Sequence, residues 1–211
     1  MTRPSADAPV GVIDYGVGNL RSVTGAIERL GHRALVSADP AVLAEAGRLV
    51  LPGVGAFGLG MENLRSRGLV PLLERLVREE HRPIFGICLG AHLFAKAGHE
   101  FGRHEGLGWI DAEVMPLTPT DGLRVPHVGW NEARPVRASL LFDDVPADAL
   151  FYYVHSYRLV CGTSELVTAE CEYGEVFPAA FQCDNLYGTK FHPEKSQRHG
   201  LTLLRNFLER A

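Results

Sequence analysis

Short apolar runs alternate with segments of helical periodicity through the first half of the chain. Apolar residues recur at the spacing of one helix face over residues 20–30 and again over residues 69–77, and Asn19 is a candidate N-cap of the first of these helices. Apolar runs of strand length lie at residues 10–15, 32–37, 48–51 and 83–87. This order predicts parallel βαβ units, with helices on both faces of one sheet.

The second half of the chain has more strand-like segments and few helices between them. Strands are predicted at residues 109–115, 123–130, 151–160 and 166–173. A closing amphipathic helix is predicted over residues 197–210. We therefore expect one α/β domain over residues 10–211, with a mostly parallel central sheet and a mixed or antiparallel extension. Residues 1–9 lack an apolar core and are expected to be a frayed lead.

Composition narrows the classes of function. The chain has 211 residues, 46% of them hydrophobic, and a net charge of −4, which fits a folded protein rather than a disordered one. Without a basic excess, binding to nucleic acid or to anionic lipid is disfavoured. No apolar run approaches the ~20 residues that span a bilayer. The four cysteines form no CxxC pair, so we expect no metal site and no disulfide scaffold, but a reduced cytoplasmic enzyme that needs no cofactor.

The sharpest local feature is the segment FGICLG around Cys88. A predicted buried strand runs into Cys88, a helix is expected to follow through Ala97, and Gly86 and Gly90 flank the cysteine. This is the spacing of a nucleophile elbow, whose tight turn raises the side chain above the sheet edge. A sulfur at a helix N-terminus is favoured as the thiolate, which is the nucleophilic form. The plainer interpretation is that Cys88 is one more small buried residue.

A candidate base for such a nucleophile lies in the segment KFHPEK. Pro193 favours extended backbone, and extended residues two apart point to the same side, so His192 and Glu194 can face one site. The carboxylate would then fix the imidazole tautomer, as in a triad with cysteine as nucleophile. Taken alone, a His-x-Glu pair is more typical of a solvated surface.

The glycine-rich segment LPGVGAFG, residues 51–58, allows two interpretations. It contains a formal GxGxxG after a strand, but Pro52 and the further glycines at Gly58 and Gly60 disfavour the immediate helix that dinucleotide binding needs. The loop suits acyl transfer better, because glycine-rich backbone can aim N–H groups at an oxyanion. We expect the N–H groups of Val54 and Leu89 to be the donors, with Gly53 and Gly55 shaping the loop.

Taken together, these motifs resemble the class I glutamine amidotransferases. GICLG and FHPE resemble the catalytic segments of that family. With IDYGVGNL, LPGVGAFG, RVPHVGWN, YYVHSY and FHPEKSQ, the resemblance narrows to the glutaminase subunits of imidazole glycerol phosphate synthase and covers almost the whole chain. It implies hydrolysis of L-glutamine to glutamate and ammonia through a thioester on Cys88. It also implies a heterodimer with a cyclase subunit, a (β/α)₈ barrel that uses the ammonia in histidine biosynthesis to make imidazole glycerol phosphate and an aminoimidazole carboxamide ribotide.

The resemblance also assigns expected roles to further residues. His155, Ser156 and Tyr157 would help to hold the glutamine. The residues expected on the partner-facing side, near the ammonia exit, are Asn19, Trp130, Tyr152 and Lys195. The resemblance also implies that the isolated subunit has almost no glutaminase activity. The reason is that the oxyanion loop at Gly53 and Val54 is misaligned until the partner subunit has bound its own ligand. Without the resemblance, Trp130 and Tyr152 would be interpreted as core aromatics and Lys195 as a solvated charge.

Two positions depart from the family pattern. His92 stands where the family usually has a glutamine that contacts the substrate, which puts glutamine affinity and its pH dependence in question. Lys190 stands where the family usually has glutamine before FHPE, and on the same face as His192 it would lower the pKa of that base.

Three other functions compete with the histidine-pathway glutaminase. One is a paralogue that feeds ammonia to a different barrel synthase, for instance in sugar or natural-product amination. Another is a non-catalytic partner-binding subunit whose altered pocket no longer accepts glutamine. The last is a stand-alone cysteine hydrolase of similar fold, which would be active without any partner.

Overall fold

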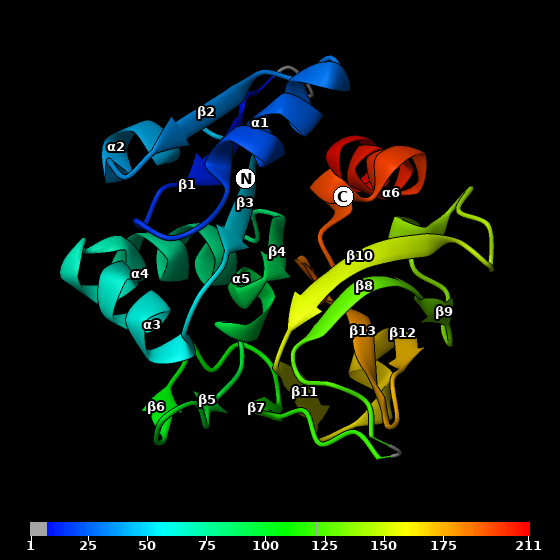
Figure 1. Ribbon diagram of the computed structural model, residues 1–211. Helices are drawn as coiled ribbons and strands as arrows, with labels where there is room; N and C mark the ends of the chain where they lie inside the picture. The colour runs from blue at the N-terminus through cyan, green and yellow to red at the C-terminus, as the bar shows by residue number, and fades with distance from the viewer. Residues whose placement is uncertain (1–7, 121) are drawn as a thin grey trace.

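The computed structural model describes residues 8–120 and 122–211, and an eight-stranded sheet forms its centre (Figure 1). The strand order is β2-β1-β3-β4-β14-β13-β12-β9. Five neighbouring strands are parallel: β2 (Ala34–Ser37), β1 (Val10–Ile13), β3 (Arg48–Gly53), β4 (Ile84–Cys88) and β14 (Leu186–Thr189). Three antiparallel strands extend the sheet: β13 (Val176–Cys183), β12 (Val167–Glu172) and β9 (Arg134–Pro135). The predicted parallel sheet with an antiparallel extension is confirmed.

Two smaller sheets lie beside the central one. An antiparallel ribbon pairs β8 (His127–Glu132) with β10 (Leu150–His155). A four-stranded sheet has the order β11 (Tyr157–Cys161), β7 (Ala112–Pro116), β5 (Ala97–Gly98) and β6 (His104–Glu105). The prediction of one strand over residues 151–160 is therefore wrong. The chain changes sheets at Ser156, whose carbonyl accepts a hydrogen bond from Leu117 N instead of continuing a ladder.

Helices cover both faces of the central sheet, as predicted. They are α1 (Leu20–Arg29), α2 (Pro40–Leu43), α3 (Phe57–Ser66), α4 (Leu69–Leu73), a π-helix (Glu74–Glu79), α5 (Leu89–His92) and α6 (Gln197–Arg210), with 3₁₀ turns at Leu140–Phe142, Ser164–Leu166 and Pro193–Lys195. Asn19 caps α1 by accepting a hydrogen bond from Ser22 N at 3.2 Å, as predicted. The helix predicted over residues 69–77 is split between α4 and the π-helix. No helix among the described residues is long and apolar enough to cross a bilayer.

Two helix predictions are wrong, and tertiary packing explains both. Helix α3 begins at Phe57, directly after the glycine-rich loop, and includes the glycines expected to prevent it. At Gly58 a Cβ would lie 2.8 Å from the His104 ring, so these glycines allow close packing rather than breaking the helix. Conversely, α5 ends after one turn. Trp109 N, from a loop, donates a hydrogen bond to Phe94 O at 2.8 Å, and Lys96 N donates to Ala112 O. These bonds take the place of further helical hydrogen bonds.

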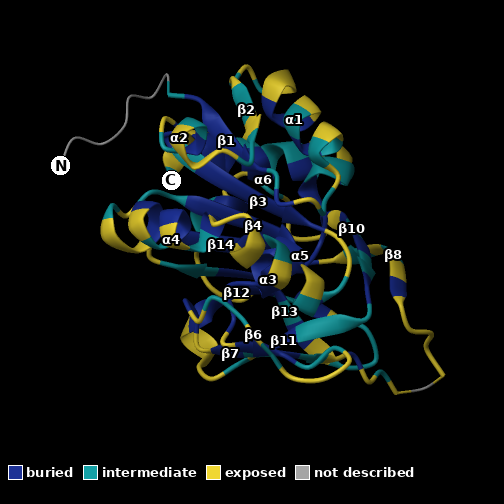
Figure 2. Cartoon of the chain, turned by 90° about the vertical axis from the view of Figure 1, so that its left-hand side faces the viewer, coloured by how far each residue is buried: buried dark blue, intermediate teal, exposed yellow. Residues whose placement is uncertain are grey.

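The central parallel strands are buried on both faces, and a separate apolar cluster lies on each. Leu49, Leu51 and Ile84 pack with α3 and α4 on one face, whereas Val50 and Phe85 pack with α1 and α6 on the other. Figure 2 shows these strands as a dark blue centre, with exposed helix faces outside. This two-sided burial fixes the strand ends, which carry the candidate catalytic groups. Residues 1–7 of the predicted frayed lead lie outside the described residues, and Pro9 O accepts a hydrogen bond from Gly47 N.

Candidate active site

Cys88 is the last residue of β4, and it has a backbone conformation that side chains rarely adopt. Its φ is 55° and its ψ is −108°, and α5 begins at the next residue. The flanking glycines are required by sterics. A Cβ on Gly90 would lie 1.7 Å from Leu51 O, and one on Gly86 would lie 2.6 Å from the Ala91 backbone. The predicted tight turn from strand to helix at Cys88 is confirmed, but α5 is too short to carry the helix dipole expected to stabilise a thiolate.

His192 and Glu194 form the predicted pair. His192 Nδ1 lies 2.7 Å from Glu194 Oε1, and both side chains are almost completely buried. The predicted reason was wrong, however: Pro193–Lys195 is a 3₁₀ turn rather than extended backbone, and that turn brings the carboxylate back to the ring. Because Nδ1 donates its proton to the carboxylate, Nε2 is left as the nitrogen that can exchange a proton with a nucleophile.

Backbone contacts hold the His192 segment against β10. His192 N donates to Tyr152 O at 2.9 Å, and the Ser196 hydroxyl donates to His192 O at 2.6 Å. The same hydroxyl accepts a hydrogen bond from Tyr152 N at 3.0 Å. The base is therefore fixed to a second strand, and its position does not depend on its own short turn alone.

Opposing effects set the charges of the nucleophile and the base. Burial alone raises the pKa of Cys88, but Lys190 and His192 outweigh burial and lower it to about 6. Burial lowers the pKa of His192, but hydrogen bonding to Cys88 and Glu194 outweighs this and raises it to about 9. Between these values the two groups form a thiolate–imidazolium pair, which is the reactive state of a cysteine nucleophile.

Lys190 points at the nucleophile. Its Nζ lies 3.5 Å from Cys88 Sγ and 3.2 Å from His92 Nε2, and the side chain is buried. The predicted lowering of the His192 pKa by this cation is not found: burial lowers that pKa, Cys88 and Glu194 raise it overall, and Lys190 is not among the groups that shift it. Burial, followed by Lys190, lowers the pKa of His92 well below its usual value, so His92 is neutral.

A cavity of about 480 Å³ lies beside Cys88, and most of the other predicted site residues line it. Val54, Gly55, Leu89, His92, His155, Ser156, Tyr157, Lys190 and Lys195 line it together with Cys88. Gly53 pairs with Cys88 in the β3–β4 register, so the glycine-rich loop leaves the sheet beside the nucleophile. A Cβ on Gly53 would lie 2.7 Å from Gly90 N, which explains why glycine is needed there. The roles of Val54 and Leu89 as oxyanion donors remain predictions.

His155, which lines the cavity, contacts a second buried histidine, His127, which was not among the predicted site residues. His155 Nδ1 donates to Tyr157 O at 2.9 Å, so its Nε2 accepts from His127 Nδ1 at 3.0 Å. The His127 ring also stacks on Tyr153 and Tyr173, with centroids 4.9 and 3.9 Å away. Burial, followed by Lys190, lowers the pKa values to about 4 for His127 and about 2 for His155. Both rings are therefore neutral with fixed tautomers, and His127 lies within the RVPHVGWN motif, which was the available signal.

The residues expected to face a partner divide into two groups. Trp130, Tyr152 and Lys195 lie together: the two rings are 6.0 Å apart, and Lys195 Nζ lies 5.7 Å from the Tyr152 ring centroid. Trp130 is 46% exposed, so its interpretation as a core residue is wrong. Asn19 is exposed at the start of α1 and caps that helix.

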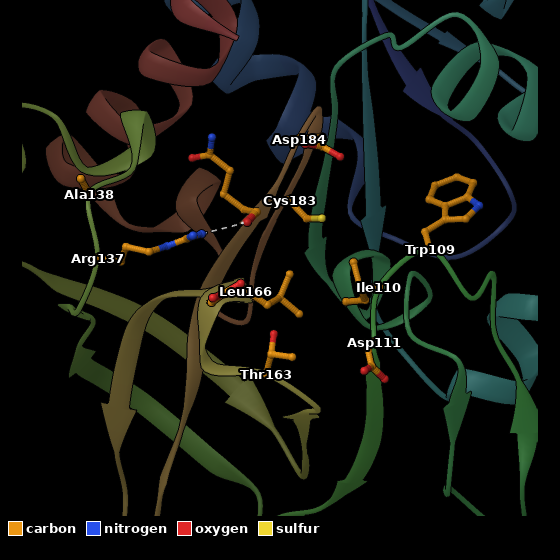
Figure 3. Close-up of a pocket in the computed structure, with 11 residues that line it drawn as sticks. Trp109, Ile110, Asp111, Arg137, Ala138, Thr163, Leu166, Cys183 and Asp184 are labelled. Atoms are coloured by element: carbon orange, nitrogen blue, oxygen red, sulfur yellow. Dashed lines mark hydrogen bonds between the residues drawn. The ribbon is translucent and has the colours of Figure 1, made fainter.

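Figure 3 shows a second cavity, of about 540 Å³, which shares no lining residue with the first. Arg137 is among the residues that line it and donates to Gln182 O at 3.1 Å. Its cysteine, Cys183, has a pKa raised by burial and then by Asp184. None of the predicted site residues lines this cavity. It is the larger of the two, but it lacks an activated nucleophile, so chemistry rather than size identifies the active site.

Comparisons with known proteins agree with this geometry. Residues 11–211 match the family model described as glutamine amidotransferase class-I. The imidazole glycerol phosphate synthase subunit HisH of Moorella thermoacetica is 45% identical, over 95% of this chain and 94% of that protein. The subunit HisH 2 of Methanococcus maripaludis is 39% identical, over 96% and 100%. The structure of PurLQS from Thermotoga maritima superposes with a TM-score of 0.73 at 16% identity, over 95% of this chain and 98% of that one, which supports the fold alone.

The family match spans nearly the whole chain, and the HisH relatives are well above 30% identity over almost their full length. The buried cysteine–histidine–glutamate site lies at the sheet edge, within the matched residues. The chain is therefore a member of the class-I glutamine amidotransferase family, among the HisH subunits of imidazole glycerol phosphate synthase.

Proposed function

We propose that this chain hydrolyses L-glutamine at Cys88 and supplies the ammonia to a cyclase subunit of imidazole glycerol phosphate synthase, in histidine biosynthesis. The observation that carries the proposal is the chain of contacts from Cys88, which lines the cavity, to His192 and from His192 to Glu194, with the thiol pKa lowered to about 6. A thiolate beside an imidazolium is suited to attack an amide carbon and to protonate the departing nitrogen.

The proposed chemistry runs in two steps. The Cys88 thiolate attacks the side-chain carbonyl of glutamine, and the N–H groups of Val54 and Leu89 bind the resulting oxyanion. His192 Nε2 gives its proton to the amide nitrogen, which leaves as ammonia, and a γ-glutamyl thioester remains. Water then attacks the thioester, His192 takes the water proton, and the thiolate departs as glutamate forms. Glu194 keeps the His192 tautomer fixed and stabilises its charged form throughout.

The β8–β10 ribbon and the residues around it are the proposed partner-facing surface. Val128, Trp130 and Leu150 are exposed by 46–55% on this ribbon, and Tyr152 and Lys195 connect it to the cavity. Exposed apolar side chains grouped on one element are typical of an interaction surface. Docking of the cyclase barrel there would place its entrance near the site of ammonia release, with Asn19 at the margin.

The test is to titrate the purified candidate cyclase subunit into this chain with L-glutamine present and to follow glutamate release. The proposal expects little release from the chain alone and strong release with the liganded cyclase. In the same assay, Cys88→Ala should lose glutamine-dependent synthesis but keep ammonia-dependent synthesis. Strong release without any partner would favour the stand-alone hydrolase. No release with the liganded partner would favour a non-catalytic binding subunit.

A paralogue that feeds a different barrel synthase is the second candidate. Its support is the contact between Lys190 and His92 in the pocket, at two positions where the family resemblance led us to expect glutamine, and the existence of numbered HisH 1 and HisH 2 proteins among the relatives. Rescue of a histidine auxotroph that lacks this subunit separates the two candidates, since only the histidine-pathway subunit restores growth.

A further inference from the structure

Lys190 is a buried cation without a carboxylate partner. The side chain is 5% exposed, and within the described part of the chain no carboxylate lies within ion-pair distance of its Nζ. The other lysines differ: Lys96 is 56% exposed and pairs with Asp111 at 2.6 Å, and Lys195 lies over the Tyr152 ring. A buried ammonium is costly unless an anion or strong acceptors compensate it, so the groups that touch Nζ require an explanation.

The fold brings Lys190 to the nucleophile through strand register. Thr189, the last residue of β14, pairs with Ile87 of β4, so the next residues on the two parallel strands are Lys190 and Cys88. Lys190 N donates to Ala179 O at 2.8 Å, which anchors its backbone to β13. The side chain then extends into the cavity, where Nζ lies 3.5 Å from Cys88 Sγ. The contact therefore follows from the central sheet and not from a mobile surface loop.

The two groups that touch Nζ suit an ammonium. His92 is neutral and buried, so its Nε2 lone pair accepts from Nζ at 3.2 Å while its Nδ1 carries the ring proton. The sulfur is the remaining contact, and it matches the cation when it is a thiolate. Burial lowers the pKa of Lys190, and the Cys88 thiolate opposes that effect, followed by a smaller contribution from the charge of Glu100. Each charge of the pair thus stabilises the other.

We propose that Lys190 is a further catalytic residue, whose ammonium holds the Cys88 sulfur as a buried thiolate, and that His92 is a positioning residue that orients the ammonium. This inference rests on the proposed function for its catalytic meaning. In the resting site, Lys190 and His192 are the two cations that stabilise the Cys88 thiolate. Lys190 keeps its protons during acylation, when the S–C bond forms, the C–N bond breaks and His192 supplies the proton to ammonia. In deacylation it stabilises the sulfur as the leaving group.

Other ionisable groups surround the pair from every packed element, and they have to be considered in any pH experiment. They are Tyr15 after β1, His92 on α5, Glu100 after β5, His127 on β8, His155 on β10, and His192 with Lys195 after β14. The pKa values of His92, His127 and His155 are lowered and that of Tyr15 is raised, so these four are neutral near the thiol midpoint. Glu100 accepts a hydrogen bond from Phe57 N at 2.8 Å. Lys190 and His192 remain the cations that act directly on the sulfur.

The experiment measures the rate of Cys88 alkylation by iodoacetamide against pH, on the full chain without glutamine or partner. Mass spectrometry of the Cys88 peptide separates it from the other thiols. In the wild type we expect a midpoint near 6, the value to which the two cations lower the pKa. In Lys190→Gln we expect a midpoint about 1–3 units higher, and so about tenfold or more slower alkylation on the acidic side. Lys96→Gln is the matched control and should keep the wild-type midpoint. An unchanged midpoint in folded Lys190→Gln would overturn the proposal.

Further variants and the wild-type midpoint itself test the ion pair. If Lys190→Gln does not fold by circular dichroism, Lys190→Met retains the aliphatic stem and takes its place. A wild-type midpoint at the ordinary thiol value of about 8.5 would also overturn the ion pair. His92→Gln retains an acceptor for Nζ and should keep the midpoint, whereas His92→Leu should raise it. If His92→Leu leaves the midpoint unchanged, His92 has no positioning role.

The alkylation assay also separates this inference from the proposed function. A midpoint that depends on Lys190 in a chain that never releases glutamate would support the ion pair and contradict the glutaminase. Robust glutamate release with a midpoint independent of Lys190 would support the glutaminase and contradict the ion pair.

Discussion

Two buried cysteines of the same sheet, Cys88 on β4 and Cys171 on β12, differ in the pKa of the thiol and in backbone conformation. Both are nearly inaccessible, at 6% and 1% exposure. The pKa of Cys88 is lowered to about 6, whereas burial raises that of Cys171 to about 12. Burial opposes the thiolate at both positions, so burial does not distinguish them. The difference comes from the cations beside Cys88.

Backbone position differs as well. Cys171 lies within a strand and pairs with Phe177 in the β12–β13 ladder. Cys88 ends its strand with a φ of 55° and lines a cavity. The site therefore combines a strained turn, which places the sulfur at the cavity, with two cations, which favour its ionised form. A cysteine that has neither feature is a core residue.

Removing each sulfur is the strongest test of this comparison. In the complex with the cyclase subunit, Cys88→Ala should lower glutamine-dependent turnover on the order of 10⁴-fold or more, because the covalent path is lost. Cys171→Ala should keep wild-type turnover and lower stability by about 1 kcal/mol through lost packing. Glutamate release and chemical denaturation measure the two effects. Glutamine-dependent turnover that survives in Cys88→Ala would show that Cys88 is not the nucleophile.

The strained turn is present at Cys88 and not at Cys171, and Gly90→Ala tests its role. The new Cβ would lie 1.7 Å from Leu51 O, so the chain should lose about 3 kcal/mol of unfolding free energy or more. Gly25→Ala is the matched control, because Gly25 is exposed on α1 with nothing within 4 Å of a Cβ. That variant should gain about 0.5–1 kcal/mol. Equal stabilities for the two variants in urea denaturation would contradict the steric role of the turn.

The second cation beside Cys88 is the imidazolium of His192, and its charged form depends on Glu194. Glu194→Gln keeps the shape but removes the charge that fixes the His192 tautomer at 2.7 Å. We expect kcat to fall about 10²–10⁴-fold, with a smaller change in KM. Steady-state glutaminase kinetics of the complex measure this. A wild-type kcat would mean that the carboxylate is only structural.

The pH profile gives the finest comparison of ionisation, at about tenfold per pH unit on each limb. Because the pKa of Cys88 is lowered, kcat/KM for glutamine should rise with pH and level off above about 6, as the thiolate forms. Because the pKa of His192 is raised, kcat/KM should fall above about 9, where the proton for the leaving ammonia is lost. Glu194→Gln should move the alkaline limb to lower pH. An acid limb near the ordinary thiol value would contradict an activated Cys88.

The periodicity of apolar residues and the capping and glycine residues at element ends predicted the parallel core of the fold correctly. Strands β1, β3 and β4 are continuous apolar runs because both of their faces are buried, and α1 has a cap and a terminal glycine at its ends. Long-range contacts determined the rest. The early end of α5 and the change of sheet at Ser156 each depend on hydrogen bonds to residues distant in the sequence, and local pattern carries no signal for these.

Cys88, His192 and Glu194 were predicted to act together because the segments FGICLG and KFHPEK contain the residue types of a triad. The 3₁₀ turn that joins His192 to Glu194 was not predicted. The neutral His127–His155 pair and the contact of Lys190 with the sulfur were missed. Both depend on the register between strands and on the direction of long side chains, which a single sequence does not specify. The excess of cations at Cys88, which sets it apart from Cys171, therefore emerges only in three dimensions.

The most direct test of the account is to quench the complex with acid during glutamine turnover and to locate the acyl group by peptide mass spectrometry. We predict a γ-glutamyl thioester on the peptide that contains Cys88, its absence in Cys88→Ser, and no label on Cys161, Cys171 or Cys183. Glutamate release with the acyl group on another residue, or with Cys88 unmodified at every quench time, would contradict the account.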